Sequence, residues 1–173
     1  MKISVIVPAY RRPRLLMNCL NALQNQTRHP DKIYITAQKN DIEVINAVNK
    51  WKTNRKKSIN TELIIVDKPG QSHAMNQAIR KIADGIVCFI DDDAEANPDW
   101  LRKIENWYKD PSIGGVGGFV LQHSAGTIDT GETKVVGEVT WYGKVIGLHH
   151  YRVSNIKEVT FFKGCNMSFR RKY

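Results

Sequence analysis

The sequence lacks several features that would assign it to a common class. No apolar run approaches the ~18 residues of a membrane-spanning helix. The apolar part of residues 1–8 is too short for a signal peptide and ends on proline. There is no glycine-rich phosphate loop of the Walker or Rossmann pattern, which argues against ordinary ATPases and dehydrogenases. Internal repeats and low-complexity segments are also absent, so we expect one globular domain.

Cysteine is scarce. The three cysteines, Cys19, Cys88 and Cys165, are far apart and odd in number, which argues against a disulfide framework. Cys19 lies on an apolar helical stripe and Cys88 in an apolar run, so we expect both to be reduced core residues. A cytoplasmic location follows as the expectation, with the inner face of the membrane left open.

Acidic residues are outnumbered by basic ones. The net charge is +9, in a chain of 173 residues that is otherwise of ordinary composition, at 42% hydrophobic and 25% charged. The excess is dispersed over residues 11–14, 55–57 and 170–172, with no basic stripe interleaved with aromatics. We therefore expect no nucleic-acid partner. A phosphate-bearing ligand and an anionic membrane surface explain the charge equally well.

Three carboxylates in a row end the most apolar segment of the chain. The run 85–90 reads as a strand buried on both faces, and Asp91, Asp92 and Asp93 follow it directly. Adjacent acids repel one another unless a cation or hydrogen-bond donors lie beside them. Ligands of open α/β sheets bind outside the carboxyl ends of strands. The triplet thus predicts an all-oxygen Mg²⁺ or Mn²⁺ site; a solvated acidic turn is the alternative.

Four strand–helix units in succession predict a parallel sheet with right-handed crossovers. The predicted strands cover residues 3–7, 32–36, 62–66 and 85–90, and the helices that follow them cover residues 13–23, 44–51, 72–82 and 98–108. In the last helix, Asn97 is expected to cap, Pro98 to begin the first turn, and Trp107 and Tyr108 to face inward.

The pattern changes after residue 112. A glycine-introduced strand is expected over 114–121, and a last strand over 158–162. Between them, turn signals at 125–126, 130–131 and 142–143 indicate short antiparallel strands or a mobile loop. Trp141 and Tyr142 are expected to pack this hairpin onto the sheet, with sugar stacking as the alternative. The adjacent pair 149–150, both histidines, is expected at the surface.

The loops after the four parallel strands share one edge of the predicted sheet. They comprise residues 8–10, 38–41, 67–71 and 91–93. A nucleotide lying across this edge would find the ring of Tyr10, carboxylates for its ribose hydroxyls, and a cation for its diphosphate.

Several of these stretches, taken together, resemble the family 2 glycosyltransferases. They are residues 4–10, 70–76, 89–93, 97–101 and 164–171, so the resemblance covers essentially the whole chain. It implies the GT-A fold, an α/β fold with a mixed, mostly parallel sheet flanked by helices. It also implies one domain over 1–173, with a nucleotide-sugar-binding half over 1–112 and the start of an acceptor half over 113–173.

The resemblance implies a transferase that moves a sugar, with inversion and metal assistance, from a UDP, GDP or dTDP donor to a carbohydrate or lipid-linked acceptor. The cofactor would be Mn²⁺ or Mg²⁺. The implied nucleotide-binding residues are Pro8, Ala9, Tyr10, Gln71, Asn76, Asp91 and Asp92; Asp93, with Asp91, would hold the metal; Gly164, Cys165 and Asn166 would border the sugar and acceptor.

Two departures from the family pattern matter. Many members carry an acid at the end of the second strand, whereas this chain has Ala37-Gln38-Lys39-Asn40, so Asp41 is the nearest candidate for that base contact. The family's catalytic base, an Asp in a Glu-Asp pair, follows the Gly-Cys-Asn stretch by some tens of residues. We expect it beyond Tyr173, in a longer enzyme of which this chain is a C-terminally truncated piece. A dimer stays open, because such a piece would expose apolar surface.

Three other classes fit the sequence less well. A sugar-phosphate nucleotidyltransferase shares much of this architecture but usually has glycines after its first strand, and residues 8–12 have none. A phosphatase with an aspartyl nucleophile needs its acids after the first strand, not the fourth. A non-catalytic binder of anions or nucleic acid is supported only by the charge.

Overall fold

The protein is described from a computed structural model that covers residues 1–53, 59–121, 123–124, 127–128 and 131–172. The elements are β1 Ile3–Ala9, α1 Pro13–Gln24, β2 Lys32–Gln38, α2 Ile42–Thr53, β3 Thr61–Val66, α3 Gln71–Ile79, β4 Ile86–Phe89, α4 Trp100–Trp107, β5 Gly115–Gly117, β6 His123–Ser124, β7 Thr127–Ile128, β8 Glu138–Val139, β9 Val145–Ile146, the 3₁₀ helix η1 Gly164–Asn166, and β10 Met167–Arg170. Across these ranges, no helix combines the length and the apolar character that crossing a bilayer requires.

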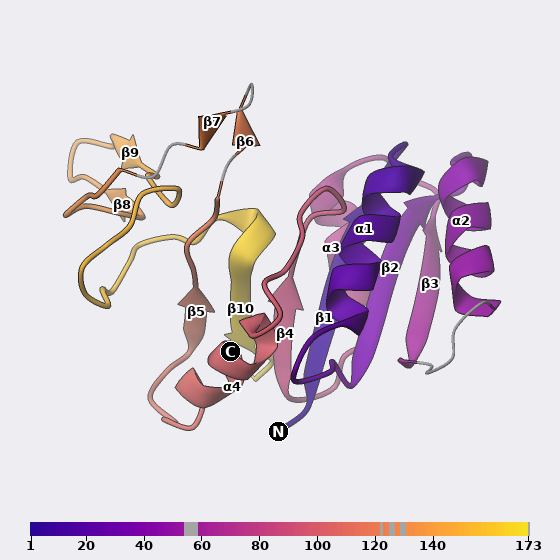
Figure 1. The fold of residues 1–173 in the computed structure, drawn as a ribbon, viewed down its shortest axis with the longest axis horizontal. Coiled ribbons are helices and arrows are strands. Elements are labelled where there is room, and N and C mark those ends of the chain that lie inside the picture. The colour runs from indigo at the N-terminus through magenta and orange to yellow at the C-terminus, as the bar shows by residue number, and fades with distance from the viewer. Residues whose placement is uncertain (54–58, 122, 125–126, 129–130, 173) are drawn as a thin grey trace.

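The main sheet has six strands in the order β3-β2-β1-β4-β10-β5 (Figure 1). The first four strands are parallel, and β10 pairs antiparallel with both β4 and β5. The predicted mixed, mostly parallel sheet is therefore confirmed. The connection after β1 leads to β2 on one side of it, and the connection after β3 leads to β4 on its other side. The gap between the carboxyl ends of β1 and β4 is thus the topological switch point, where open α/β sheets bind their ligands.

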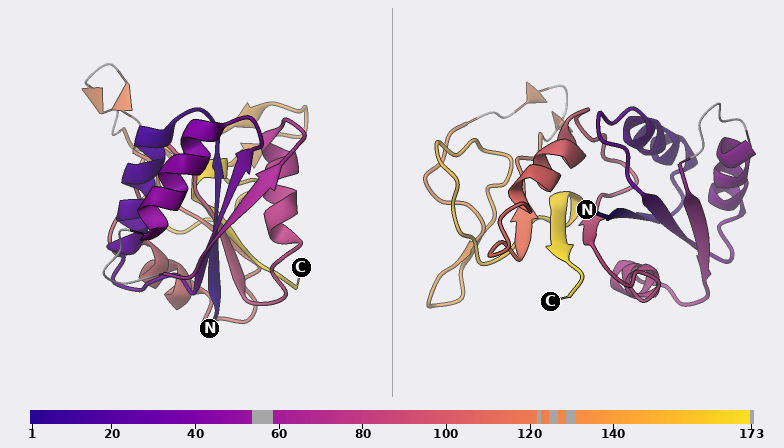
Figure 2. Two further views of the ribbon diagram at one scale, coloured as in Figure 1. Left: turned by 90° about the vertical axis from the view of Figure 1, so that its right-hand side faces the viewer. Right: turned by 90° about the horizontal axis from the view of Figure 1, so that it is seen from below.

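Helices cover both faces of the sheet (Figure 2). Val5 and Val7 of β1 pack with Leu16 of α1 and Leu101 of α4 on one face. Ile6 points the opposite way and packs with α3 on the other. Alternate residues of a strand face opposite sides, so a central strand covered on both faces must be apolar throughout.

Helix α4 differs from the expectation at both ends. It begins at Trp100, because Asn97 forms a turn in which its Oδ1 accepts the Asp99 N–H at 3.1 Å and its carbonyl accepts the Trp100 N–H at 2.9 Å. Trp107 is 41% exposed, so its predicted inward position is wrong. Leu101 is followed on the same helical stripe by residue 108, seven positions on, and Tyr108 is accordingly buried. The Tyr108 hydroxyl lies 3.0 Å from Ser168 Oγ.

The last strand is also displaced from its expected position. Residues 158–162 form no strand, and the sheet is completed instead by β10. A Cβ added at Gly115 or Gly117 of β5 would lie 2.9 or 2.4 Å from the ring of Phe162. The glycines therefore make room for Phe162 to pack over β5, against Phe169 with ring centroids 5.5 Å apart. The predicted glycine-introduced strand shortens to the three residues of β5.

Residues 131–163 carry an antiparallel β8–β9 hairpin that turns at the expected 142–143 position. The strands β6 and β7 form a second antiparallel pair. The turn signals at 125–126 and 130–131 lie wholly or partly outside the described residues. Trp141 is 95% exposed, so the prediction that it packs onto the sheet is wrong. His149 is buried rather than at the surface, with its ring against Phe161.

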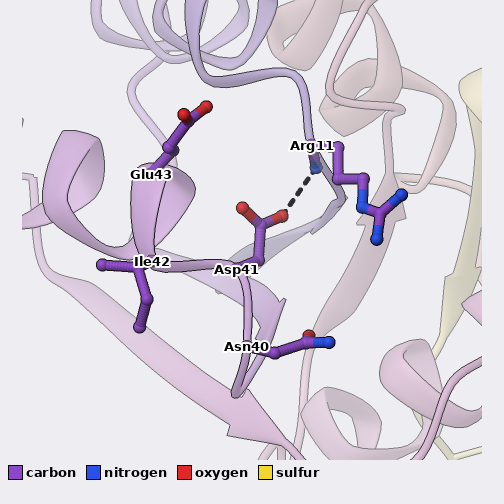
Figure 3. Close-up of a pocket in the computed structure, with 5 residues that line it drawn as sticks. All are labelled: Arg11, Asn40, Asp41, Ile42 and Glu43. Carbon is purple, nitrogen blue, oxygen red and sulfur yellow. Dashed lines mark hydrogen bonds between the residues drawn. The ribbon is translucent and has the colours of Figure 1, made fainter.

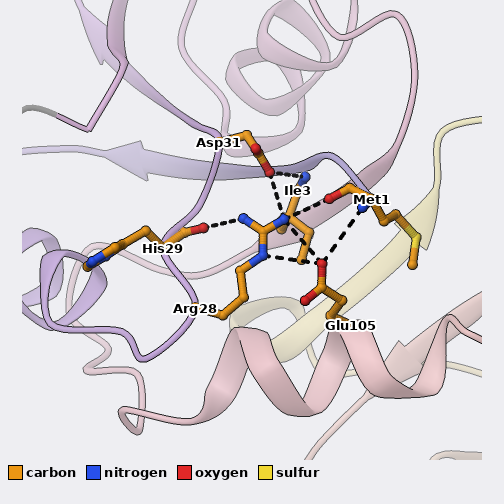
Figure 4. Close-up of polar contacts among 6 residues, drawn as sticks. All are labelled: Met1, Ile3, Arg28, His29, Asp31 and Glu105. Atoms are coloured by element: carbon orange, nitrogen blue, oxygen red, sulfur yellow. Dashed lines mark hydrogen bonds and ion pairs between the residues drawn. The ribbon is translucent and has the colours of Figure 1, made fainter.

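A polar cluster joins the start of β1 and the segment before β2 to the last turn of α4 (Figure 4). Arg28 Nη2 lies 3.2 Å from Glu105 Oε1 of α4 and 2.9 Å from Asp31 Oδ2. The same Asp31 oxygen accepts the Ile3 N–H at 2.8 Å. The cluster thus fixes the start of β1 relative to α4.

Glycine is required at position 85 for two reasons, which a pair of variants separates. Gly85 has φ +92° and its added Cβ would lie 2.5 Å from the Lys2 carbonyl oxygen, whereas Gly143 has φ +85° with open space around it. We expect Gly143→Ala to cost about 1–2 kcal/mol of unfolding free energy from backbone strain alone. Gly85→Ala should cost about 2–4 kcal/mol, because the clash adds to the strain. Denaturant unfolding measures both, and equal losses would show that the close approach to Lys2 is not rigid.

Candidate functional site

The carboxylate of Asp92 joins the loop after β1 to the end of β4. Asp92 is fully buried. Its Oδ2 accepts the Tyr10 N–H at 3.0 Å, and Arg12 Nη2 lies 2.6 Å from its Oδ1. Burial raises the pKa of Asp92, and the Tyr10 N–H and the Arg12 guanidinium act against that rise. The sequence led us to expect Asp92 to face the ribose; the structure places it beneath the loop, where it holds Tyr10 and Arg12 in position.

Arg12 forms a second ion pair, through Nη1, with the exposed carboxylate of Asp93. One guanidinium therefore bridges two of the three acids. Sequence reasoning missed this residue and counted it only as part of the dispersed positive charge. The available signal was topological: if β1 and β4 are neighbours at the switch point, the basic loop after β1 meets the acids after β4.

Asp91, the first of the three acids, accepts a hydrogen bond from Gln71 Nε2 at 3.0 Å. Burial is the main cause that raises its pKa, and the neighbouring Asp93 adds to it. Arg12, Gln71 and Lys163 lower the pKa but do not cancel the rise. Three carboxylates thus lie together with one guanidinium paired to two of them, an excess of negative charge that favours cation binding.

Asp41, the candidate for the base contact, accepts two backbone hydrogen bonds, of which Figure 3 shows the one from Arg11. Oδ2 accepts the Arg11 N–H at 2.6 Å, and Oδ1 accepts the Val44 N–H at 3.3 Å, near the start of α2. The first of these bonds holds Arg11, whose φ of 56° lies in the left-handed region. Asp41 therefore shapes the loop after β1.

A cavity of about 380 Å³ lies beside this contact at the carboxyl edge of the sheet. A second depression adjoins it at Asn40. The first is lined by Arg11, Asn40, Asp41, Ile42 and Glu43, and the second by Gln38, Lys39, Asn40, Asp67 and Pro69. Their linings come from the loops after β1, β2 and β3, as the shared-edge argument predicts.

Tyr10 is the aromatic group exposed at this edge. Its ring is 43% exposed, and the Arg11 guanidinium carbon lies 4.9 Å from the ring centroid. Ala9 before it is buried, and Pro8 is half-buried at the end of the strand. Of the three residues expected to line a nucleoside pocket, Tyr10 is the one whose side chain is open to a ligand.

The Gly164–Asn166 turn borders the acids from the other side. Asn166 Oδ1 accepts the Trp100 Nε1–H at 2.8 Å, and its Nδ2 donates to the Phe119 carbonyl at 3.1 Å, so this side chain links α4 to the segment after β5. Burial raises the pKa of Cys165, and the charge of Asp91 raises it further. Asn76 is exposed on α3, five positions past Gln71.

The acids after β4 have the donor chemistry that Mg²⁺ and Mn²⁺ prefer, but not a full set of ligands. Within the described ranges there is no group of three or more His, Cys, Asp or Glu side chains placed to hold an ion. Asp91 and Asp93 nevertheless fit a Mg²⁺ or Mn²⁺ site of the kind in which one or two carboxylates act with substrate phosphates.

The sheet order, the helical layers and the acids after β4 define a GT-A glycosyltransferase fold. The profile of Glycosyl transferase family 2 matches residues 4–173. The chain therefore belongs to glycosyl transferase family 2, which confirms the resemblance seen in the sequence.

Two curated relatives are similar over most of the chain. The O-antigen chain rhamnosyltransferase RfbN of Salmonella typhimurium is 28% identical over 127 residues, which cover 71% of this chain and 38% of the relative. The O-antigen biosynthesis protein RfbC of Myxococcus xanthus is 29% identical over 152 residues, covering 81% of this chain and 11% of the relative. The chain thus spans well under half the length of either.

Solved structures agree on the fold. A mannosyltransferase of Pyrobaculum calidifontis, in complex with GDP-Man and Mn²⁺, matches with a TM-score of 0.62 and 25% identity over 70% of this chain and 36% of that one. TarS 1–349 of S. aureus matches with a TM-score of 0.68 and 17% identity over 99% of this chain and 47% of that one. TarS has also been solved in complex with UDP-GlcNAc, at a TM-score of 0.59, 21% identity and coverage of 73% and 36%. The TarS likeness shows the fold alone.

Asp91→Asn is expected to stabilise the protein at neutral pH. The pKa of Asp91 is higher in the folded than in the unfolded protein, so ionisation of Asp91 lowers the free energy of unfolding. This loss develops as the pH rises from the unfolded-state pKa to the folded-state pKa. Asparagine keeps the acceptor for Gln71 and removes the charge. Because the side chain is only partly buried, we expect a gain below about 1 kcal/mol, or about 2–4 °C in Tm. The gain should vanish below about pH 4.

Asp110→Asn is the control of opposite sign. Hydrogen bonds from Ser112 lower the pKa of Asp110, so its charge stabilises the fold above the unfolded pKa and this contribution is lost as pH falls. Thermal melts of both variants from pH 3 to 8 should therefore diverge in opposite directions. A lower Tm for Asp91→Asn at pH 7 would contradict the charge balance described here.

Arg12→Gln should destabilise the fold more than Arg14→Gln. Removing the guanidinium leaves the buried Asp92 with an unbalanced charge, at a cost of about 1–3 kcal/mol. Arg14 is an exposed arginine two positions on, so its replacement should change the unfolding free energy by less than about 0.5 kcal/mol. Urea unfolding of the two variants tests this prediction. Equal urea midpoints would contradict a structural role for Arg12.

Proposed function

We propose that the protein transfers a sugar from a nucleoside-diphosphate donor to an acceptor at the carboxyl edge of its sheet. The observation that carries this proposal is the meeting, at the switch point, of the exposed ring of Tyr10, the guanidinium of Arg12, and the acids Asp91 and Asp93. Family membership supports it, as does the GDP-Man complex of the mannosyltransferase neighbour.

In this proposal the nucleoside lies over the loops after β1, β2 and β3. Tyr10 offers its ring to the base, and Asn40 and Arg11 offer polar groups from the cavity lining. Asp41 and Asp92 act indirectly, by fixing the backbone of the Tyr10–Arg11 loop. Gln71 orients Asp91, and Asn76 on the same helix extends the polar edge. Pro8 and Ala9 form the floor on which the loop begins.

Asp91 and Asp93 are the residues that would hold a Mn²⁺ or Mg²⁺ ion, together with oxygens of the donor diphosphate. Such an ion supplies Lewis-acid stabilisation of the departing diphosphate. The three neighbouring carboxylates, of which Arg12 pairs with only Asp92 and Asp93, support this assignment, because an excess of negative charge favours a cation. Arg12 and Lys163, whose charge reaches Asp91, would add positive charge beside the diphosphate.

The Gly164–Asn166 turn would border the transferred sugar and the acceptor, a carbohydrate or a lipid-linked carbohydrate. Direct displacement at the anomeric carbon gives inversion and needs a base that takes the acceptor proton. We assign that role to no described residue, because the acids near the turn are Asp91 and Asp93, which the proposal places on the metal.

Titration calorimetry with UDP, GDP and dTDP, each with Mn²⁺ and with chelator, tests the donor site. We expect one diphosphate to bind and to require the metal. Asp93→Ala should weaken that binding by at least about tenfold, a loss that even an outer-shell partner of a metal can cause. The matched control is Asp84→Ala, which removes an exposed aspartate that pairs with Lys2 away from the edge.

Binding that is the same with chelator, or the same in Asp93→Ala, would contradict the metal assignment while leaving the nucleotide site intact. Failure of all three diphosphates to bind, by a chain that melts cooperatively, would contradict the proposed donor site itself.

A further inference from the structure

The tip of the β8–β9 hairpin displays two aromatic side chains on a rigid turn. Gly143 N–H donates to the Thr140 carbonyl at 2.9 Å, and Thr140 N–H donates to the Lys144 carbonyl at 2.9 Å. The Thr140 hydroxyl oxygen accepts the Lys144 N–H, also at 2.9 Å. Trp141 and Tyr142 thus occupy the two central positions of a tight turn that is closed by hydrogen bonds on both sides.

Aromatic residues are unusual at the central positions of a turn. Central turn positions favour Gly, Pro, Asn, Asp and Ser, because those residues suit the backbone and are readily hydrated. Here Trp141 is 95% exposed and Tyr142 is 61% exposed, and their rings pack edge-to-face on each other with centroids 5.4 Å apart. Neither ring contributes to the two core clusters. Trp141 and Tyr142 thus depart from the residue preference of turns without adding to the packing of the core, and such departures often mark functional sites.

The sides of the hairpin continue the apolar tip. Val139 and Val145 are directly paired across the two strands and are 43% and 62% exposed. The hairpin lies at the end of the molecule far from β3 and α2 (Figure 1). It is a projecting, convex element, unlike the concave sites that bind small molecules. Thr140, which could offer a hydroxyl to a sugar, already uses its oxygen within the turn.

The tip of the hairpin carries positive charge only. Lys144 is exposed beside the two rings, and Arg152 and Lys157 are exposed in the segment that follows, whereas the nearest acids in the sequence, Glu138 and Glu158, lie at the start of β8 and after Lys157. An exposed Trp–Tyr pair flanked by cations matches the interface of an anionic bilayer, where aromatic rings lie at the headgroup level and lysines neutralise lipid phosphates.

We propose that the β8–β9 hairpin docks this protein onto an anionic lipid surface, with Trp141 and Tyr142 entering the headgroup region and Lys144 contacting lipid phosphates. A second copy of the chain is the weaker occupant. The two depressions found at the carboxyl edge are lined mainly by polar and charged residues, which do not complement an apolar tip. The proposal stands independently of the transferase activity, since it uses none of the donor-site residues.

Flotation with vesicles of phosphatidylcholine alone, and with one quarter phosphatidylglycerol, tests the docking surface. The protein should bind the anionic vesicles and not the neutral ones. The double variant Trp141→Ala/Tyr142→Ala and the charge reversal Lys144→Glu should each reduce binding about tenfold or more. Matched controls are Trp107→Ala and Lys103→Glu, which change an exposed tryptophan and an exposed lysine on α4 and should bind as the parent chain does.

Quenching by lipids brominated on their acyl chains distinguishes insertion from purely electrostatic adhesion. Tryptophan fluorescence of the parent chain should be quenched on anionic vesicles, and Trp141→Phe should lose that quenching while still binding. All these side chains are exposed, so the variants should melt as the parent does. Absence of binding to anionic vesicles, binding that survives the double variant, or a hairpin-dependent change of oligomeric state instead of vesicle binding would overturn the proposal.

Discussion

The buried carboxylate of Asp92 is the contact on which the geometry of the candidate site depends. It follows β4, and it holds the loop that follows β1 through the Tyr10 N–H and the Arg12 guanidinium. A buried charge is tolerated only when it is paired and hydrogen-bonded, so the two loops must close on each other for the fold to be stable. Because the two loops are joined in this way, the exposed Tyr10 ring lies near the flanking acids Asp91 and Asp93.

Charge at the edge is balanced incompletely. Arg12 pairs with Asp92 and Asp93, while Asp91 accepts a hydrogen bond from the uncharged side chain of Gln71. Such a site is less stable than an uncharged one would be, which is a common cost of binding sites. Under the proposed function, a cation and a diphosphate would complete the balance, and Arg12 could keep its contact with Asp92 while leaving Asp93 to the ion.

The parts of the structure that rest on local patterns could be predicted from the sequence. The four parallel strands, the order of strands and helices, and the acids at the end of β4 all follow from apolar runs and their ends. The ion pair of Arg12 with Asp93 could not, because it joins residues 81 positions apart through the pairing of β1 with β4. Once that pairing is known, the contact is a natural consequence.

Other errors have a similar origin. Trp107 and Tyr108 are adjacent aromatics, and one residue of helical rotation decides which faces the core. The last strand was misplaced because residues 158–162 and 167–170 both look apolar enough, and the choice depends on the glycines of β5, which accept Phe162 against them. The hairpin aromatics were expected to pack onto the sheet, but they occupy the tip of the β8–β9 turn, where Trp141 is 95% and Tyr142 61% exposed.

The account's central claim is that ligands bind where the ends of β1 and β4 meet. Paramagnetic broadening by Mn²⁺ with a bound nucleoside diphosphate, followed in amide NMR spectra, tests it most directly. The account predicts selective loss of the signals of residues 10–12 and 91–94, with those of the β8–β9 hairpin and the end of α2 unaffected. Broadening centred on any other part of the chain, with these two loops unchanged, would contradict it.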